Sequence, residues 1–205
     1  MNVELVQATP NPVEFIAKIA SICYDSDPKD PMKLVKHLYR NGHHSVFEHV
    51  YFTFKVEGIS RACSHQWVRH RHTSPTQRSQ RYCSEDGFGF VVPPSLEGED
   101  EYLHEIEVIR GWYESYQRRG IKNEDARFIL PEACETKMFV SFNLRELIHI
   151  ANERLCSRAQ WEIRGLVRKM VELVEPELRW MLVPKCQSGF LLCNNPCKER
   201  GAKEE

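Results

Sequence analysis

Between His49 and Val56, bulky apolar residues alternate with more polar ones, which is the period of a β-strand that buries only one face. Shorter segments of strand character occur elsewhere, and several of the segments between them have the spacing of amphipathic helices. Helices and strands do not alternate regularly, as they do in a parallel α/β fold. The sequence therefore predicts an α+β protein: a single compact domain over residues 1–185, with a mixed sheet and several helices.

The expected element boundaries follow from apolar spacing and from capping residues. We expect strands at residues 3–6, 49–56, 88–92 and 137–142. We expect helices at residues 11–23, 31–40, 60–69, 99–119, 123–130 and, with a break near Ser157, 143–181. Ser60 and Asn143 precede helical segments as N-caps. A polar loop holding Pro75 is expected after residue 69, and Pro176 is expected to kink the last helix.

The charge balance and the hydrophobic pattern restrict the possible partners. The 205 residues include 28 Lys and Arg against 29 Asp and Glu, which argues against a general affinity for nucleic acid or an anionic membrane. No apolar run approaches the ~18 residues of a transmembrane helix. The first five residues lack the basic head and apolar stretch of a secretory signal. We therefore expect a cytoplasmic protein with no nucleic-acid or membrane partner.

Eight cysteines raise the question of disulfides or a metal. Without a secretory signal, reduced thiols are expected. Cys186, Cys193 and Cys197 form a C-x6-C-x3-C pattern that is loose for a zinc site and needs a fourth ligand. The histidines between His43 and His72 are poorly spaced for a metal, since one pair has an arginine between its members. We predict no metal, and a flexible tail over residues 186–205.

From Gly58 to Ser84 the chain has no acidic residue but five arginines. A solvated basic face is the ordinary interpretation of such a run. Here the residues between the arginines include many hydroxyl and amide side chains, Pro75 stiffens the segment, and no carboxylate neutralises the charge. A bound anion, such as the phosphates of small ligands, is therefore the expected counter-charge.

Within this run, Arg69-His70-Arg71 is followed after seven residues by Ser79, a pattern written RHR-x7-S. The run RHRHTSPTQRSQRY resembles the signature of the flavin-dependent thymidylate synthases. Three further segments resemble this family in the same order: GHHSVFEH at residues 42–49, ARFILP at 126–131 and NLRELIHIANERLCSRAQWE at 143–162. The resemblance covers roughly residues 1–185.

The resemblance implies an enzyme that makes dTMP from dUMP. In this family methylenetetrahydrofolate is the carbon donor, FAD carries the hydride and NADPH is the reductant. The expected partners are therefore dUMP and folate, and the expected assembly is a homotetramer whose FAD sites are shared between subunits. The flavin carries the demanding chemistry, while the protein orients the ligands and supplies positive charge.

The resemblance also implies roles for individual residues. The residues expected to hold FAD are Ser45, Arg69, His70, Arg71, Gln77, Asn143, Leu144, Arg145 and His149. Those expected to hold dUMP are Gln66, Arg69, Gln77, Arg78, Ser79, Gln80, Arg81, Arg127 and Arg154. Arg154 is the expected catalytic residue, because a guanidinium at the uracil edge stabilises negative charge that develops on the pyrimidine.

This chain departs from the family pattern at four places. Thr76-Gln77 stands where Asn-Glu is common, so that Gln77 cannot serve as a base. Arg78 replaces a common leucine, His149 an asparagine and Arg158 a histidine. Two alternatives remain: a nucleic-acid module that stacks bases on its aromatic residues, and a flavoprotein of the same fold that has lost methylation.

Overall fold

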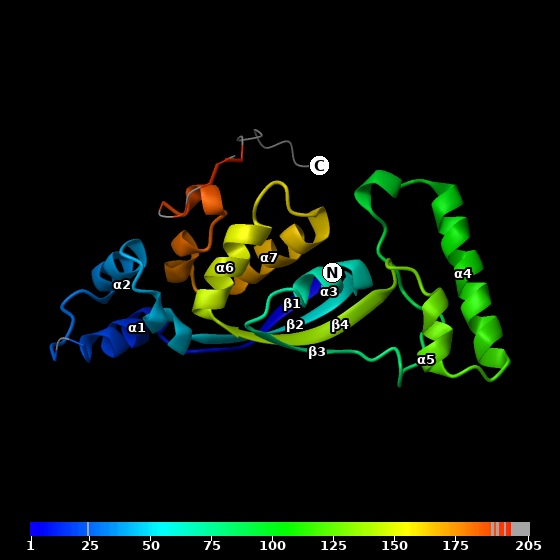
Figure 1. Ribbon diagram of the computed structural model, residues 1–205, viewed down its shortest axis with the longest axis horizontal. Helices are drawn as coiled ribbons and strands as arrows, with labels where there is room; N and C mark the ends of the chain where they lie inside the picture. The colour runs from blue at the N-terminus through cyan, green and yellow to red at the C-terminus, as the bar shows by residue number, and fades with distance from the viewer. Residues whose placement is uncertain (24, 190, 192, 195, 198–205) are drawn as a thin grey trace. The chain divides into compact units, whose positions relative to one another are not determined.

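The structure is a computed structural model that describes residues 1–23, 25–189, 191, 193–194 and 196–197 (Figure 1). Its sheet has four strands in the order β1-β2-β4-β3. Their bounds are Asn2–Ala8 for β1, Tyr51–Ser60 for β2, Thr73–Gln77 for β3 and Glu135–Asn143 for β4. Helices and one sheet together confirm the α+β class.

The sheet is antiparallel, so the predicted mixed sheet is wrong. Thr9, just after β1, donates its backbone N–H to Tyr51 at the start of β2, and Leu144, just after β4, donates to Val50. Arg78, just after β3, donates to Lys137 near the start of β4. In each pair of adjacent strands, the end of one strand therefore lies beside the beginning of the other, which is the antiparallel arrangement. After β1, the helical segment brings the chain back to the same end of the sheet, where β2 begins. Strands β1 and β2 therefore run in opposite directions.

The described residues group into two compact units. The first comprises residues 1–2, 56–69 and 75–139, and we call it the α4 unit after its long helix α4 (Asp100–Arg118). The second comprises residues 3–55, 70–74 and 140 onward, and we call it the α6 unit after its helix α6 (Leu144–Arg154). The boundaries between them fall within or beside strands. The prediction of one domain over residues 1–185 stays a prediction.

The α4 unit contains helices α3 (Arg61–Trp67), α4 (Asp100–Arg118) and α5 (Asn123–Ala126) and the 3-10 helices η2 (Pro94–Leu96) and η3 (Arg127–Ile129). The long helix α4 lies along α5 and η3 (Figure 1). Phe88, Ile106 and Cys134 form a small apolar core in this unit. Ser60 caps α3 as predicted, because its hydroxyl accepts a hydrogen bond of 3.0 Å from the Cys63 backbone N–H.

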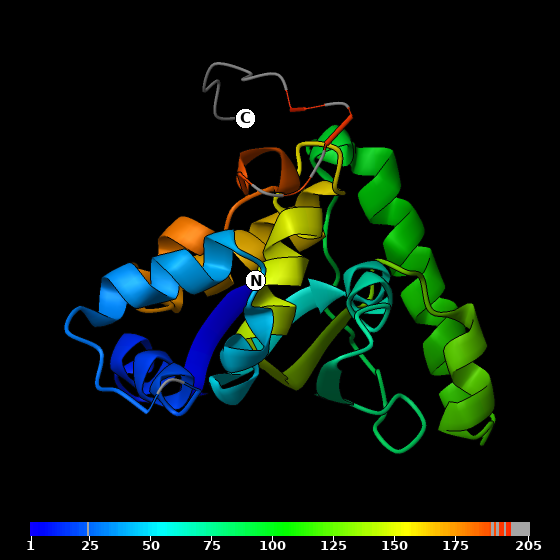
Figure 2. The ribbon, with the colours of Figure 1, turned by 60° about the vertical axis from the view of Figure 1, so that its left-hand side comes forward.

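The α6 unit contains α1 (Pro12–Ser21), α2 (Pro31–Arg40), α6 (Leu144–Arg154) and α7 (Trp161–Leu173). Its 3-10 helices are η1 (His44–His49), η4 (Pro176–Met181) and η5 (Lys185–Gln187). Figure 2 shows α1 beside α2 and α6 beside α7. Phe52 and Phe54 of β2 are fully buried, which confirms the alternating pattern. Phe54 stacks on Phe142 of β4 with ring centroids 5.7 Å apart.

Several expected elements differ from the structure. The segment around Pro75, expected as a loop, is β3; because β3 is the edge strand of the sheet, a residue without an N–H is tolerated there. The strand expected at residues 88–92 is a single bridge between Phe90 and Cys134. The last helix ends at Leu173, and Pro176 begins η4 rather than kinking a continuous helix.

Two further predictions concern a membrane-spanning helix and the C-terminal tail. Among the described residues, no helix is both long enough and apolar enough to cross a membrane. The tail predicted to be flexible includes residues 198–205, which lie outside the described residues. Its first two residues, Cys186 and Gln187, belong to η5 (Lys185–Gln187), which packs against α6.

Candidate functional site

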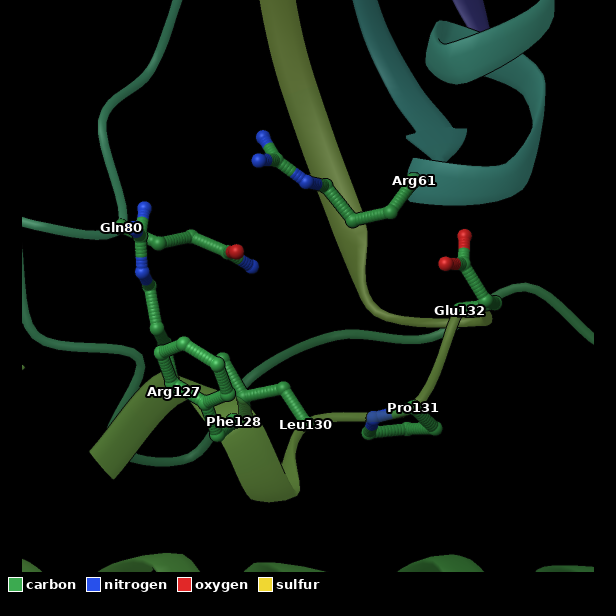
Figure 3. Close-up of a pocket in the computed structure, with 7 residues that line it drawn as sticks. All are labelled: Arg61, Gln80, Arg127, Phe128, Leu130, Pro131 and Glu132. Atoms are coloured by element: carbon green, nitrogen blue, oxygen red, sulfur yellow. The ribbon is translucent and has the colours of Figure 1, made fainter. Parts of the chain in front are cut away.

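The α4 unit holds a cavity of about 310 Å³ whose polar lining includes two residues predicted to bind dUMP, Gln80 and Arg127. Arg61, the first residue of α3, lines it as well, and in Figure 3 the side chains of Arg61 and Gln80 extend toward each other. The remaining lining residues are Phe128, Leu130, Pro131 and Glu132. Two guanidinium groups and an amide above an apolar floor suit a small anionic ligand.

Local structure fixes the polar residues of this cavity. Gln80 is 8% exposed, and its amide nitrogen lies 3.7 Å from the Cys134 sulfur. Arg127 begins η3 and donates from Nε to the carbonyl of Glu124 at 3.2 Å. Sequence reasoning missed Arg61 as a site residue. Its position in the acid-free run was the one signal that pointed to it.

Gln77 and Ser79, two further predicted residues of the acid-free run, form hydrogen bonds within the α4 unit. Gln77 donates to the hydroxyls of Ser64 and Thr136 at 2.8 and 3.1 Å. Ser79 accepts a hydrogen bond of 3.2 Å from the backbone N–H of Arg81. A turn thus aligns Ser79, Gln80 and Arg81.

Two arginines of this run form ion pairs. Arg81 is paired with Glu124 at 2.8 Å, with more than half of its side chain exposed. Such a pair exchanges readily for a ligand phosphate in water. Arg78 instead pairs with the buried Glu85 and donates to the Ser84 carbonyl at 2.8 Å. It lines a separate cavity of about 340 Å³ in the same unit, so the structure does not bring Arg78 to Arg61 and Arg127.

The α6 unit holds a second cavity, of about 530 Å³. Three of the residues predicted to bind FAD line it, namely Asn143, Arg145 and His149. Its other lining residues are Glu48, His72 and Glu146. Asn143 caps α6, since its side-chain oxygen accepts a hydrogen bond of 2.9 Å from the Glu146 N–H. Helix α6 therefore presents its first turn to this cavity, and Arg145 forms an exposed ion pair with Glu48.

His70 and Arg154, 84 residues apart in sequence, meet in the α6 unit. Arg154 donates from Nε to His70 Nε2 at 2.9 Å, so the imidazole proton resides on Nδ1. His70 Nδ1 lies 3.8 Å from the carboxylate of Glu146, and the His149 ring lies edge-on with its centroid 5.9 Å away. Glu146 was not among the predicted site residues, although its place three residues after the cap is a common position for Glu.

Burial and charge keep His70 neutral. Its side chain is almost completely buried, and this desolvation lowers its pKa to about 4, with Arg154 and His149 acting in the same direction. Burial has the opposite effect on Glu146, whose pKa is raised. A neutral His70 can therefore hold the Arg154 guanidinium without repelling it.

The ligand-type atoms of His70, Glu146 and His149 all lie within 4.8 Å of one another, which is the spacing of a possible metal site. Both nitrogens of His70 already face other groups, because Nε2 accepts from Arg154 and Nδ1 faces Glu146. The guanidinium would also repel a cation. The arrangement fits a hydrogen-bonded network better than a metal site.

The remaining predicted residues are spread over both units. Leu144 is fully buried, and its backbone N–H donates to Val50 at 2.7 Å. Ser45 lies exposed on η1, which packs against α6. Arg71 is exposed, and so is Arg69 just after α3; neither lines one of the two cavities. Gln66 lies near the end of α3.

The chain matches the family described as "Thymidylate synthase complementing protein" over residues 4–178. This chain belongs to that family. It is 40% identical to the flavin-dependent thymidylate synthase of Geobacter sulfurreducens, over 98% of this chain and 92% of the relative. It is 41% identical to the enzyme of the same name from Pyrococcus furiosus, over 98% of this chain and 90% of the relative.

Solved structures of this thymidylate synthase family share the fold. The structure of Thymidylate Synthase X from Helicobacter pylori with FAD and dUMP has a TM-score of 0.77 and covers 89% of this chain and 97% of that chain, at 21% identity. A second structure from the same organism gives a TM-score of 0.76. The family resemblance predicted from RHR-x7-S is confirmed.

Proposed function

We propose that this chain converts dUMP to dTMP by flavin-dependent reductive methylation. The observation that carries the proposal is the match to flavin-dependent thymidylate synthases at about 40% identity over nearly the whole chain. In support, two of the residues expected to contact dUMP line a cavity rich in arginine, and three of those expected to contact FAD line a cavity at the start of α6.

The cavity of the α4 unit suits the nucleotide phosphate. Arg61 and Arg127 supply charge, and Gln80 supplies an amide donor, all from backbone that hydrogen bonds hold in place. Arg81, whose pairing with Glu124 is open to solvent, adds a cation that can turn from the carboxylate to a phosphate. Ser79 fits a binding role here, since a serine hydroxyl is a weak nucleophile without a base to activate it.

The cavity of the α6 unit fits FAD by the chemistry of its donors. Arg145, Asn143 and His149 offer hydrogen bonds and charge to a pyrophosphate or a ring carbonyl, and the first turn of α6 adds a favourable dipole. The carboxylate of Glu48 competes for Arg145 in solvent, where such a pair is weak. Asn143, Arg145 and His149 would hold FAD, whose chemistry when bound would be hydride transfer from NADPH to the nascent methyl group.

Arg154 is the residue that we assign to the uracil. Its guanidinium remains charged, and neutral His70 orients it through Nε. We assign to its Nη groups a contact with an acceptor on the pyrimidine. As uracil C5 becomes nucleophilic, negative charge grows on the ring, and a preorganised cation stabilises it. His70 acts by positioning this group.

The remaining parts of the proposal concern co-substrates and assembly. NADPH and methylenetetrahydrofolate serve as co-substrates in the cytoplasm. A homotetramer shares its FAD sites between subunits, which accords with the modest size of the cavity that a single chain offers to so large a cofactor.

Tritium release from [5-³H]dUMP, with NADPH, FAD and methylenetetrahydrofolate, tests the reaction directly. Release of tritium that depends on NADPH, FAD and methylenetetrahydrofolate supports the proposal. A protein that binds FAD and oxidises NADPH without release would instead be a flavoprotein that has lost methylation. A colourless protein that binds oligonucleotides in a salt-dependent manner would contradict the proposal.

The two arginine roles are separable by substitution. Arg71→Ala should purify with less flavin and recover partly when FAD is added in excess. Arg154→Ala should retain its flavin and its reduction by NADPH, while methylation falls by ~10²-fold or more. Arg118→Ala, an exposed residue at the end of α4, is the matched control and should be unaffected. Loss of FAD from the Arg154 variant, with normal methylation once reconstituted, would reverse the assignment.

A further inference from the structure

One cysteine near the end of the chain lies against a cysteine 41 residues earlier in the sequence. Cys156 lies in the loop between α6 and α7, two residues after Arg154. Cys197 comes from the C-terminal tail, and its sulfur lies 3.6 Å from that of Cys156. The tail also carries Cys186 within η5 and Cys193, and all four residues are half-buried. The function that we propose for this chain assigns no role to these thiols.

The distance between the two sulfurs distinguishes two kinds of site. A disulfide requires a separation of about 2.05 Å. In a tetrahedral zinc site the Zn–S bonds are about 2.3 Å, which places neighbouring sulfurs about 3.8 Å apart. The 3.6 Å between Cys156 and Cys197 therefore matches the edge of a zinc tetrahedron.

The surroundings of Cys197 favour a thiolate. The Ser157 N–H points at its sulfur from 3.4 Å, and such a donor orients and stabilises a metal-bound thiolate. Hydrogen bonds with Ser157, and after them contacts with the Cys156 and Cys186 thiols, lower the pKa of Cys197 to about 7. The Cys156 sulfur and the Ser157 N–H thus both lie against the Cys197 sulfur, and the Cys186 thiol also interacts with it.

We propose that Cys156, Cys186, Cys193 and Cys197 bind one zinc ion. Binding converts four thiols and Zn²⁺ into a tetrathiolate complex of net charge −2 and releases four protons to solvent, with no change of oxidation state. Basic residues next to the ligands in sequence offset this charge: Lys185 precedes Cys186, and Arg158 lies two residues after Cys156 in the same loop.

The ion would be structural, because four protein ligands leave no open position. It would fasten the tail to the loop that follows Arg154. The C-x6-C-x3-C pattern alone lacks a fourth ligand, and Cys156, 41 residues before Cys197, is the residue that supplies it. This proposal replaces our sequence-based prediction that the protein binds no metal.

Metal analysis of the purified full-length protein tests the proposal. We expect about one zinc per chain by mass spectrometry of the elements. Cys156→Ser and Cys197→Ser should each reduce the zinc content by at least tenfold. Cys23→Ser and Cys83→Ser are matched controls, because both residues are exposed and far from the tail in sequence, and they should retain the metal.

A second measurement keeps the test decisive if a variant folds poorly. Wild-type protein is treated with a mercurial that reacts with thiols, and the released zinc is measured with a coloured zinc indicator. The release of one zinc ion should accompany the modification of the four ligand cysteines. Protein that contains no zinc after purification and exposure to zinc salts would overturn the proposal. A native mass two hydrogens lighter, with Cys156 and Cys197 in one peptide pair, would also overturn it in favour of a disulfide.

Discussion

Replacing His70 with glutamine should remove most of a steep loss of stability on acidification. The pKa of His70 falls from an ordinary 6.5 to about 4 in the folded protein, chiefly through burial and then through Arg154 and His149. Between these two values the unfolded chain binds a proton that the folded chain does not, so a fall in pH favours unfolding. His70→Gln keeps an acceptor for the Arg154 N–H but carries no titrating group.

The size of the effect follows from the two pKa values. One pKa unit is worth ~1.4 kcal/mol, so the complete loss, reached below pH 4, is about 3 kcal/mol. Somewhat more than half of it, about 2 kcal/mol, should be lost between pH 7 and pH 5. Glu146, whose burial raises its pKa, acts with the opposite sign. The difference between wild type and variant therefore isolates His70 better than the wild-type curve alone.

Urea unfolding at pH 7, 6 and 5, at one fixed protomer concentration, measures this difference. The free energy of unfolding of the wild type should fall by about 2 kcal/mol more than that of His70→Gln. His65→Gln, which changes an exposed histidine of α3, should follow the wild type. Curves for wild type and His70→Gln that stay parallel within about 0.5 kcal/mol would refute the assignment of a neutral, buried His70.

Three further predictions rest on single contacts. Ser79→Ala should raise the Kd for dUMP and leave measurable turnover, and an unchanged Kd with no turnover would point to a nucleophile. Tyr113→Phe should cost about 1–2 kcal/mol of unfolding free energy, because the Tyr113 hydroxyl accepts from the buried Glu85 N–H at 3.0 Å; a loss near zero would contradict this. Asn143→Ala should cost about 1 kcal/mol by removing the α6 cap, and an equal effect of Asn2→Ala, which changes an exposed residue of β1, would show that capping is not the cause.

Local signals in the sequence predicted the helices and the principal strands. Ser60 and Asn143 cap helices as expected, because a short polar side chain before an apolar period satisfies the first free N–H groups whatever surrounds it. The strand at Pro75 escaped prediction, since proline is tolerated there only because β3 lies at the edge of the sheet. Strand order is a property of the whole chain that no local pattern carries.

The site shows the same division between local and long-range information. The RHR-x7-S motif indicated the anion-binding run, and charge alone pointed to phosphate. It could not separate Arg61, which reaches the cavity with Arg127, from Arg78, which pairs with Glu85. Both are arginines in one acid-free segment. Only the fold determines which of them meets a buried carboxylate.

The position of Arg154 connects the site with the proposed zinc. A side chain that stabilises developing charge must be held in place before the reaction, since reorganising it costs part of the energy that it contributes. The guanidinium of Arg154 is held by His70, which burial keeps neutral. Arg154 is the last residue of α6, and Cys156 follows two residues later. A helix end frays easily unless a neighbouring contact fixes it. Anchoring Cys156 to the tail would restrain the C-terminal end of α6. The guanidinium of Arg154 would then be held by His70 and its backbone by the anchored loop, both before dUMP binds.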